Sequence, residues 1–120
     1  MLQSTVIAGP YRLTPQKITE VVTEISPGNY TLGRVREDRF QVLYVGRADE
    51  DLAKQLHSWA KHNSRYGAFV FTYALTAKAA FYKECEDFHD FGGTEGLENA
   101  RHPERPAKTD WLCPRCYHYG

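Results

Sequence analysis

With 120 residues, of which 42% are hydrophobic, the chain can bury one core and hardly two, so we expect one domain with a short C-terminal appendage. Its 15 lysines and arginines balance 15 aspartates and glutamates, and a formal charge of zero lacks the basic excess that is usual in nucleic-acid-binding domains. No apolar stretch approaches the roughly 20 residues of a membrane helix, and the first residues lack the pattern of a secretory signal, so we expect a soluble cytoplasmic protein with no membrane partner.

The first predicted element is a helix that begins at Pro15, with Thr14 as its N-cap, and continues through Ile25. The sequence Ser26-Pro27-Gly28 is predicted to end it. A β-hairpin follows, because residues 30–32 and 40–45 have strand composition and residues 36–39 have the polar composition of a turn.

A second helix is predicted from Glu50 to about His62, where apolar residues recur at helical spacing, and a third strand from Ala68 to Ala74. Thr76 is the expected N-cap of a third helix, which Gly92-Gly93 ends. One face of this helix is predicted to carry Ala80, Phe81, Glu84, Cys85 and Phe88. This order of elements predicts an α+β fold with a small three-stranded sheet, antiparallel or mixed, flanked by helices.

The charges are less even along the chain than in total. Acidic residues follow one another from Glu84 to Glu98 with no lysine or arginine between them, whereas the first half is rich in basic residues. The basic set comprises Arg34, Arg36, Arg39, Arg47, Lys54, Lys61 and Arg65. One region therefore suits phosphates and the other suits a cation.

Four short motifs, in order along the chain, resemble the GIY-YIG endonuclease family. Gly28-Asn29-Tyr30 ends in the Gly-x-Tyr of the first signature, and Tyr44-Val45-Gly46, one hairpin later, is similar to the second. The segments 51–56 and 79–84 resemble the family's first helix and the Ala-x-x-x-Glu motif that places its metal-binding glutamate. The resemblance divides the chain into an N-terminal helical extension (1–27), a GIY-YIG-like domain (28–99) and a tail (100–120).

The resemblance implies a nuclease that hydrolyses phosphodiester bonds with one Mg²⁺ or Mn²⁺, and DNA as the expected partner. It implies that Tyr30 is the general base, that Tyr44 positions water or phosphate and that Glu84 holds the metal, on one concave surface. Asn99 is similar to the polar residue that closes the family's active site. The alternative interpretation makes Tyr30 and Tyr44 a cross-strand aromatic pair and Glu84 a solvated helix residue.

One position departs from the family pattern. Where family members resembling this chain carry an arginine that grips the scissile phosphate, this chain has Gln55, whose neutral amide cannot form the charged bidentate contact. Arg47, Lys54 or Arg65 are the candidate replacements, with Gly46 and Gln55 also expected beside the substrate; the alternative is that these basic side chains are ordinary surface charges.

The cysteines predict a second metal site. Cys113 and Cys116 have the spacing of half a zinc site, and the odd total of three cysteines does not suit a disulfide framework. Cys85 and His89 lie four residues apart on one helix face and would complete a Cys₃His set for a structural Zn²⁺, with His102 and His118 as rival fourth ligands. The alternative is a buried Cys85 and a redox-active or unligated pair at Cys113 and Cys116.

Two functions are consistent with these patterns. The first is a divalent-metal-dependent endonuclease. The second is a domain of the same fold that has lost catalysis together with the helix arginine and serves as a nucleic-acid-binding or protein-interaction module stabilised by zinc. Gln55 favours the second, and the combination of Tyr30, Tyr44 and Glu84 favours the first.

Overall fold

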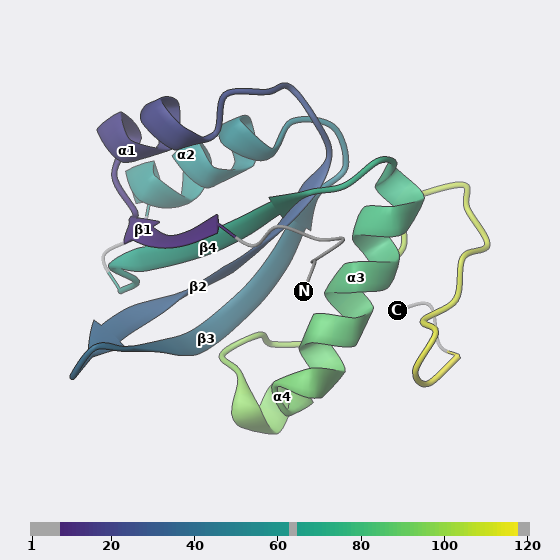
Figure 1. The fold of residues 1–120 in the computed structure, drawn as a ribbon. Helices are drawn as coiled ribbons and strands as arrows, with labels where there is room; N and C mark the ends of the chain where they lie inside the picture. The colour runs from purple at the N-terminus through teal and green to yellow at the C-terminus, as the bar shows by residue number, and fades with distance from the viewer. Residues whose placement is uncertain (1–7, 63–64, 118–120) are drawn as a thin grey trace, which may run out of the picture.

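The computed structural model of the protein describes residues 8–62 and 65–117, which form a four-stranded sheet flanked by helices (Figure 1). The strands β1 (Ala8–Arg12), β2 (Gly28–Arg36), β3 (Arg39–Ala48) and β4 (Ala68–Tyr73) are arranged in the order β1-β4-β2-β3, and every neighbouring pair is antiparallel. The helices are α1 (Pro15–Val21), α2 (Leu52–His62), α3 (Ala77–Asp90) and the short α4 (Gly93–Gly96). The predicted α+β class is confirmed, with one more strand than expected.

The additional strand is β1, which pairs with β4 at the edge of the sheet. Its sequence Ala8-Gly9-Pro10-Tyr11-Arg12 lacks the alternating pattern of a strand, and its pairing with β4 is irregular between Ala8 and Tyr11. Proline has no N–H to donate to a neighbouring strand. A segment that contains proline is therefore found at the edge of a sheet and not in its centre. Tertiary pairing, and not local composition, makes this segment a strand.

Helix α1 is shorter than predicted. Thr14 is its N-cap, with the side-chain oxygen accepting a hydrogen bond from the Lys17 N–H at 3.2 Å, as expected. The helix nevertheless ends at Val21, because the hydroxyl of Tyr73 on β4 accepts hydrogen bonds from the backbone N–H groups of Thr23 and Glu24, at 3.0 and 3.2 Å. Ile25, expected on the apolar face, is 88% exposed.

The main core lies between the sheet and the pair α1 and α2, which cover the same face (Figure 1). Ile18 of α1 and Leu52 and Leu56 of α2 are fully buried there against Leu32 and Phe69 of the sheet. Within residues 8–27, which were expected to form a helical extension, β1 belongs to the sheet and α1 belongs to the core.

Helix α3 covers the opposite face of the sheet (Figure 1). Its buried residues are the five of the predicted stripe, namely Ala80, Phe81, Glu84, Cys85 and Phe88, and Thr76 caps its start through a 3.0 Å hydrogen bond from the Ala79 N–H. From residue 97 to residue 117 the described chain has no further helix or strand, so the tail is loop-rich as predicted. Within the described residues no helix has the length and apolar character needed to cross a membrane.

Candidate functional site

A polar pocket opens at the edge of the sheet, between β3, α3 and the segment 99–104. Tyr44, Glu84 and residues 99–104 line it, and its volume is about 400 Å³. We call it the edge pocket. Because β3 is the last strand of the sheet, side chains from either of its faces can reach this open edge. The edge pocket thus brings together Tyr44, from the face that α2 covers, and Glu84, from the helix on the other face.

Glu84 is paired with Arg47 inside a small network. The carboxylate oxygen Oε1 of Glu84 lies 2.7 Å from Nη1 of Arg47, and both side chains are about nine-tenths buried. The same guanidinium donates from Nε to Asp49 at 2.8 Å and from Nη2 to the backbone carbonyl of Glu104 at 2.7 Å, and it stacks over the ring of Phe81. These contacts use three of the five N–H donors of Arg47.

The electrostatics of Glu84 result from two opposed effects. Burial raises the pKa of its carboxyl group to about 7, because a charged carboxylate loses solvation in the interior, while the Arg47 guanidinium acts in the opposite direction. Burial also raises the pKa of the half-buried Tyr44, and the nearby Glu84 adds to this shift. A carboxyl group that titrates near neutrality in a polar pocket is typical of functional sites, although structural ion pairs also produce such shifts.

Tyr30 does not line the edge pocket. Its side chain is 3% exposed and belongs to the core under α2, where its hydroxyl accepts hydrogen bonds from Trp59 Nε1 at 2.8 Å and from Gln55 Nε2 at 3.4 Å. The ring crosses directly over Gly46, and a β-carbon at Gly46 would overlap it. Burial raises the pKa of Tyr30 above its usual value, which opposes the expected role as a general base.

The expected substrate-binding residues are also dispersed. Asn99 lines the edge pocket, but its amide is occupied by backbone hydrogen bonds with Val45, one accepted at 3.1 Å and one donated at 2.9 Å. Arg65 lies 3.1 Å from Glu98 in an exposed ion pair. Lys54 and Gln55 are exposed on α2 and are not among the residues that line the edge pocket.

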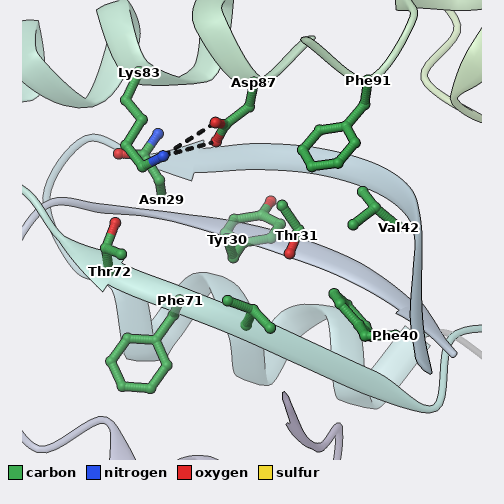
Figure 2. A pocket seen from close by; sticks show the side chains of 11 residues that line it. Asn29, Tyr30, Thr31, Phe40, Val42, Phe71, Thr72, Lys83, Asp87 and Phe91 are labelled. Carbon is green, nitrogen blue, oxygen red and sulfur yellow. Dashed lines mark hydrogen bonds and ion pairs between the residues drawn. The ribbon is translucent and has the colours of Figure 1, made fainter. Parts of the chain in front are cut away.

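A second cavity, of about 280 Å³, lies between α3 and the sheet on the other side of the helix (Figure 2). Its walls are mostly apolar, and Lys83 and Asp87 form an ion pair at 3.0 Å above it. At one end lie Asn29 and Thr72, whose Oδ1 and Oγ1 atoms are buried without a hydrogen-bond partner in the described chain, although Asn29 Nδ2 donates to the Ala80 carbonyl at 2.8 Å. Because its walls are mostly apolar, whereas the edge pocket is lined mostly by polar groups, this cavity offers less to a metal or phosphate than the edge pocket does.

A cluster of possible metal ligands lies beside the edge pocket. The ligand atoms of His89, His102, Cys113 and Cys116 all lie within 4.8 Å of one another, and two thiols and two imidazoles can hold a metal ion such as zinc. The predicted set differs in one member, because His102 takes the place expected for Cys85.

Cys85 lies next to the ligand group but does not belong to it. It is fully buried, packs with Phe81 and hydrogen-bonds to the Cys113 side chain. His102 is brought in by the chain after α4, where its ring lies edge-on to those of Phe88 and His89, with ring centroids 5.2 and 5.3 Å apart. The other rival ligand, His118, lies outside the described residues.

Several partners in these sites have only weak sequence signals. Asp49 and the carbonyl of Glu104, which hold Arg47, belong to no motif. Trp59, which packs against the core, is also the hydrogen-bond donor to Tyr30, and its position four residues after Gln55 was a usable signal because both side chains then project from one helix face.

Comparison with known proteins adds no relative. No family model matches the chain, and neither a curated protein nor a solved structure resembles it significantly.

Proposed function

We propose that the protein is a divalent-metal-dependent endonuclease whose reaction centre is the edge pocket. The observation that carries this proposal is that the buried carboxylate of Glu84, held by Arg47 at 2.7 Å, lies with Tyr44 in a polar pocket of about 400 Å³, where burial raises the pKa of Glu84 to about 7. The order of the four family-like motifs supports the same assignment. The nucleic acid is most simply DNA, as the resemblance implies.

Glu84 can supply part of the ligand shell that one divalent cation needs. Mg²⁺ is commonly held by one or two carboxylates, with substrate phosphates and water completing its six positions. Within the described residues, the only group of three or more ligand side chains is the His₂Cys₂ cluster, which does not include Glu84. A cation in the edge pocket would therefore have Glu84 as its main protein ligand. When bound, the cation would neutralise phosphate charge and lower the pKa of a water molecule.

The remaining steps belong to the side chains around Glu84. Arg47 holds the carboxylate in place and favours its ionised form. The Tyr44 hydroxyl, with its raised pKa, stays protonated and can donate a hydrogen bond to a phosphate oxygen in the pocket. Tyr30 has a structural role in this proposal: its ring packs on Gly46, two residues after Tyr44 on β3.

Cleavage assays with a matched pair of variants test this proposal. Purified protein is incubated with labelled single- and double-stranded DNA and RNA in Mg²⁺, Mn²⁺ or EDTA. Glu84→Gln should reduce metal-dependent cleavage by at least about a hundredfold, because it removes the charged ligand. Glu95→Gln, on the exposed α4, is the control and should cleave normally. Cleavage in EDTA, or by Glu84→Gln at the normal rate, would contradict the mechanism.

A non-catalytic nucleic-acid-binding or protein-interaction module is the second candidate. Two observations favour it: Gln55 occupies the position of the phosphate-gripping arginine, and Arg47 is engaged by Glu84, Asp49 and Glu104. In the same assay this function predicts stable binding of nucleic acid or of a protein partner without cleavage in any metal.

We further propose that the ion in the His₂Cys₂ cluster is Zn²⁺. Thiolate and imidazole ligands suit Zn²⁺, whereas Mg²⁺ and Mn²⁺ prefer oxygen ligands. Four protein ligands also fill a tetrahedral shell, which is typical of a structural site and leaves no position for substrate.

A further inference from the structure

We propose that a Zn²⁺ ion bound by His89, His102, Cys113 and Cys116 acts as a clamp that holds the segment 99–104 in place as the wall of the edge pocket. The ligands come from three places along the chain: His89 from α3, His102 from the segment 99–104, and both cysteines from residues 113–116 of the tail. An ion shared by all three would link the tail to the helix that carries Glu84.

The spacing of the four side chains fits a tetrahedral shell. Bonds of about 2.3 Å to sulfur and 2.0–2.1 Å to nitrogen put neighbouring ligand atoms roughly 3.3–3.8 Å apart. Cys116 Sγ and His102 Nε2 already lie 3.4 Å apart, and the widest separation in the group is within 4.8 Å. Small side-chain adjustments therefore suffice to close the shell.

The two histidines present ligand atoms in the manner of a metal site. His102 Nδ1 lies 2.8 Å from the Pro103 carbonyl, so Nδ1 carries the proton and Nε2 is left as the ligand atom facing Cys116. The Nε2 atom of His89 is buried and has no hydrogen-bond partner among the described residues. A buried nitrogen in that state costs free energy, and a metal bond would satisfy it.

The Cys113–Cys116 turn is held near α3. Within the turn, the backbone N–H of Arg115 donates to Cys113 Sγ at 3.4 Å. The Arg115 guanidinium contacts Glu86 and Asp90 of α3 at 3.0 and 2.6 Å. These contacts place the two cysteines opposite His89 without using the metal.

The segment 99–104 is attached to the rest of the protein at both of its ends. Asn99 is bonded to Val45 of β3, and the carbonyl of Glu104 accepts from Arg47, the partner of Glu84. Between them lies His102, which lines the edge pocket and belongs to the metal cluster. The ion would therefore fix the middle of a wall whose two ends are tied to the site itself.

Zinc content and hydrogen exchange test the clamp independently of nuclease activity. The full chain is purified without a metal-affinity tag, and elemental analysis should find one Zn²⁺ per chain. Removal of the metal with a chelator should raise the exchange rates of amides in the segment 99–104 by at least about tenfold, with little change in β2 and β4, because local openings depend on local contacts. This outcome does not depend on the proposed endonuclease function, so either proposal can fail alone.

Substitutions decide which residues are ligands. Cobalt(II) loaded in place of zinc should give the thiolate charge-transfer and tetrahedral absorption bands. His102→Gln should weaken metal binding by at least about tenfold, whereas Cys85→Ser, the matched control, should retain one equivalent of metal and the same bands. Less than about a tenth of an equivalent of zinc in the purified protein, full binding by His102→Gln, or unchanged exchange after chelation would overturn the proposal.

Discussion

Glu84 is the residue whose chemistry is set most clearly by its surroundings. Its neighbours Asp49 and Asp87 add negative charge, burial removes water, and only Arg47 favours the ionised form. The net result is a pKa near 7, so at neutral pH a proton and a cation compete for the same carboxylate.

This competition predicts a pH dependence of cleavage. At a metal concentration below saturation, the rate should rise with pH up to about 7 and then level off, because only the ionised carboxylate binds the cation. The slope below the pKa should be about tenfold per pH unit, as for one titrating group. Rates measured from about pH 5.5 to pH 8.5 check this, and saturating metal should move the midpoint to lower pH.

The pH dependence of stability tests the raised pKa of Glu84 independently of cleavage. The pKa of Glu84 is higher in the folded protein than its usual value of 4.5, so between pH 4.5 and about 7 the folded state binds more protons than the unfolded state. Glu84 therefore makes the free energy of unfolding decrease as pH rises through this window. Urea unfolding of Glu84→Gln should lack this contribution; an identical pH dependence in both proteins would mean that Glu84 does not titrate near 7.

For single residues, the sequence predicts which side chains share a helix face, but it does not predict how deeply each side chain is buried. The placement of Glu84 and Cys85 on the buried stripe of the last long helix follows from three- and four-residue steps, and the structure agrees. The burial of Tyr30 depends on Trp59 and Gly46, which lie far from it in sequence. His102, and not Cys85, belongs to the group of metal ligands because of the path that the chain takes after α4. This segment is irregular, so its sequence has no periodic pattern from which the path could be predicted.

At the scale of elements, α2 is where the chain departs from the nuclease pattern. The helix carries Gln55 on its exposed side, with Nε2 at 3.4 Å from the Tyr30 hydroxyl. The position is open to a longer side chain, and a guanidinium there would supply the charged bidentate donor that an amide lacks.

Gln55 does not line the edge pocket, so Gln55→Arg should raise cleavage, by about tenfold or more, if DNA bound in that pocket also reaches the exposed side of α2, since one added donor to a phosphate is typically worth this or more. The gain should appear in kcat/KM measured on one DNA substrate. Gln55→Lys is the matched control: it adds the charge without the planar fork and should recover less. Equal or lower activity in Gln55→Arg would indicate that α2 does not face the scissile phosphate.

Local signals define the starts of elements better than their ends. Thr14-Pro15 and Thr76 begin helices as predicted, because an N-cap is a contact between residues close in sequence. The end of α1 is determined by Tyr73, about fifty residues away, and β1 exists because β4 offers it an edge. Neither partner can be recognised from the segment itself.

At the scale of the whole molecule, a net charge of zero conceals a separation of charges. Arg34, Arg36 and Arg39 are exposed on the β2–β3 hairpin, which extends beyond the helices (Figure 1). Its two-residue turn, Glu37-Asp38, has positive φ at both positions. By contrast, Arg47 and Arg65 are paired with acidic side chains. The hairpin therefore presents three exposed arginines close together, a surface that suits the phosphates of a nucleic acid.

Salt dependence of binding tests this role of the hairpin. In a Glu84→Gln background, where cleavage is not expected, the double variant Arg36→Gln and Arg39→Gln should bind duplex DNA more weakly. Each phosphate contact contributes about 0.9 to the slope of log affinity against log salt, so the loss of two should reduce that slope by about 2. Fluorescence anisotropy at several salt concentrations measures both quantities.

The control removes two charges elsewhere, through Lys78→Gln and Lys108→Gln, which are exposed at the start of α3 and in the tail. This variant has the same net charge as the hairpin variant, so any difference between the two arises from position and not from total charge. If both variants lose affinity and slope equally, the binding is non-specific attraction to the whole surface. If only the hairpin variant changes, then β2 and β3, the strands that carry Tyr30 and Tyr44, also carry the contact that holds the nucleic acid.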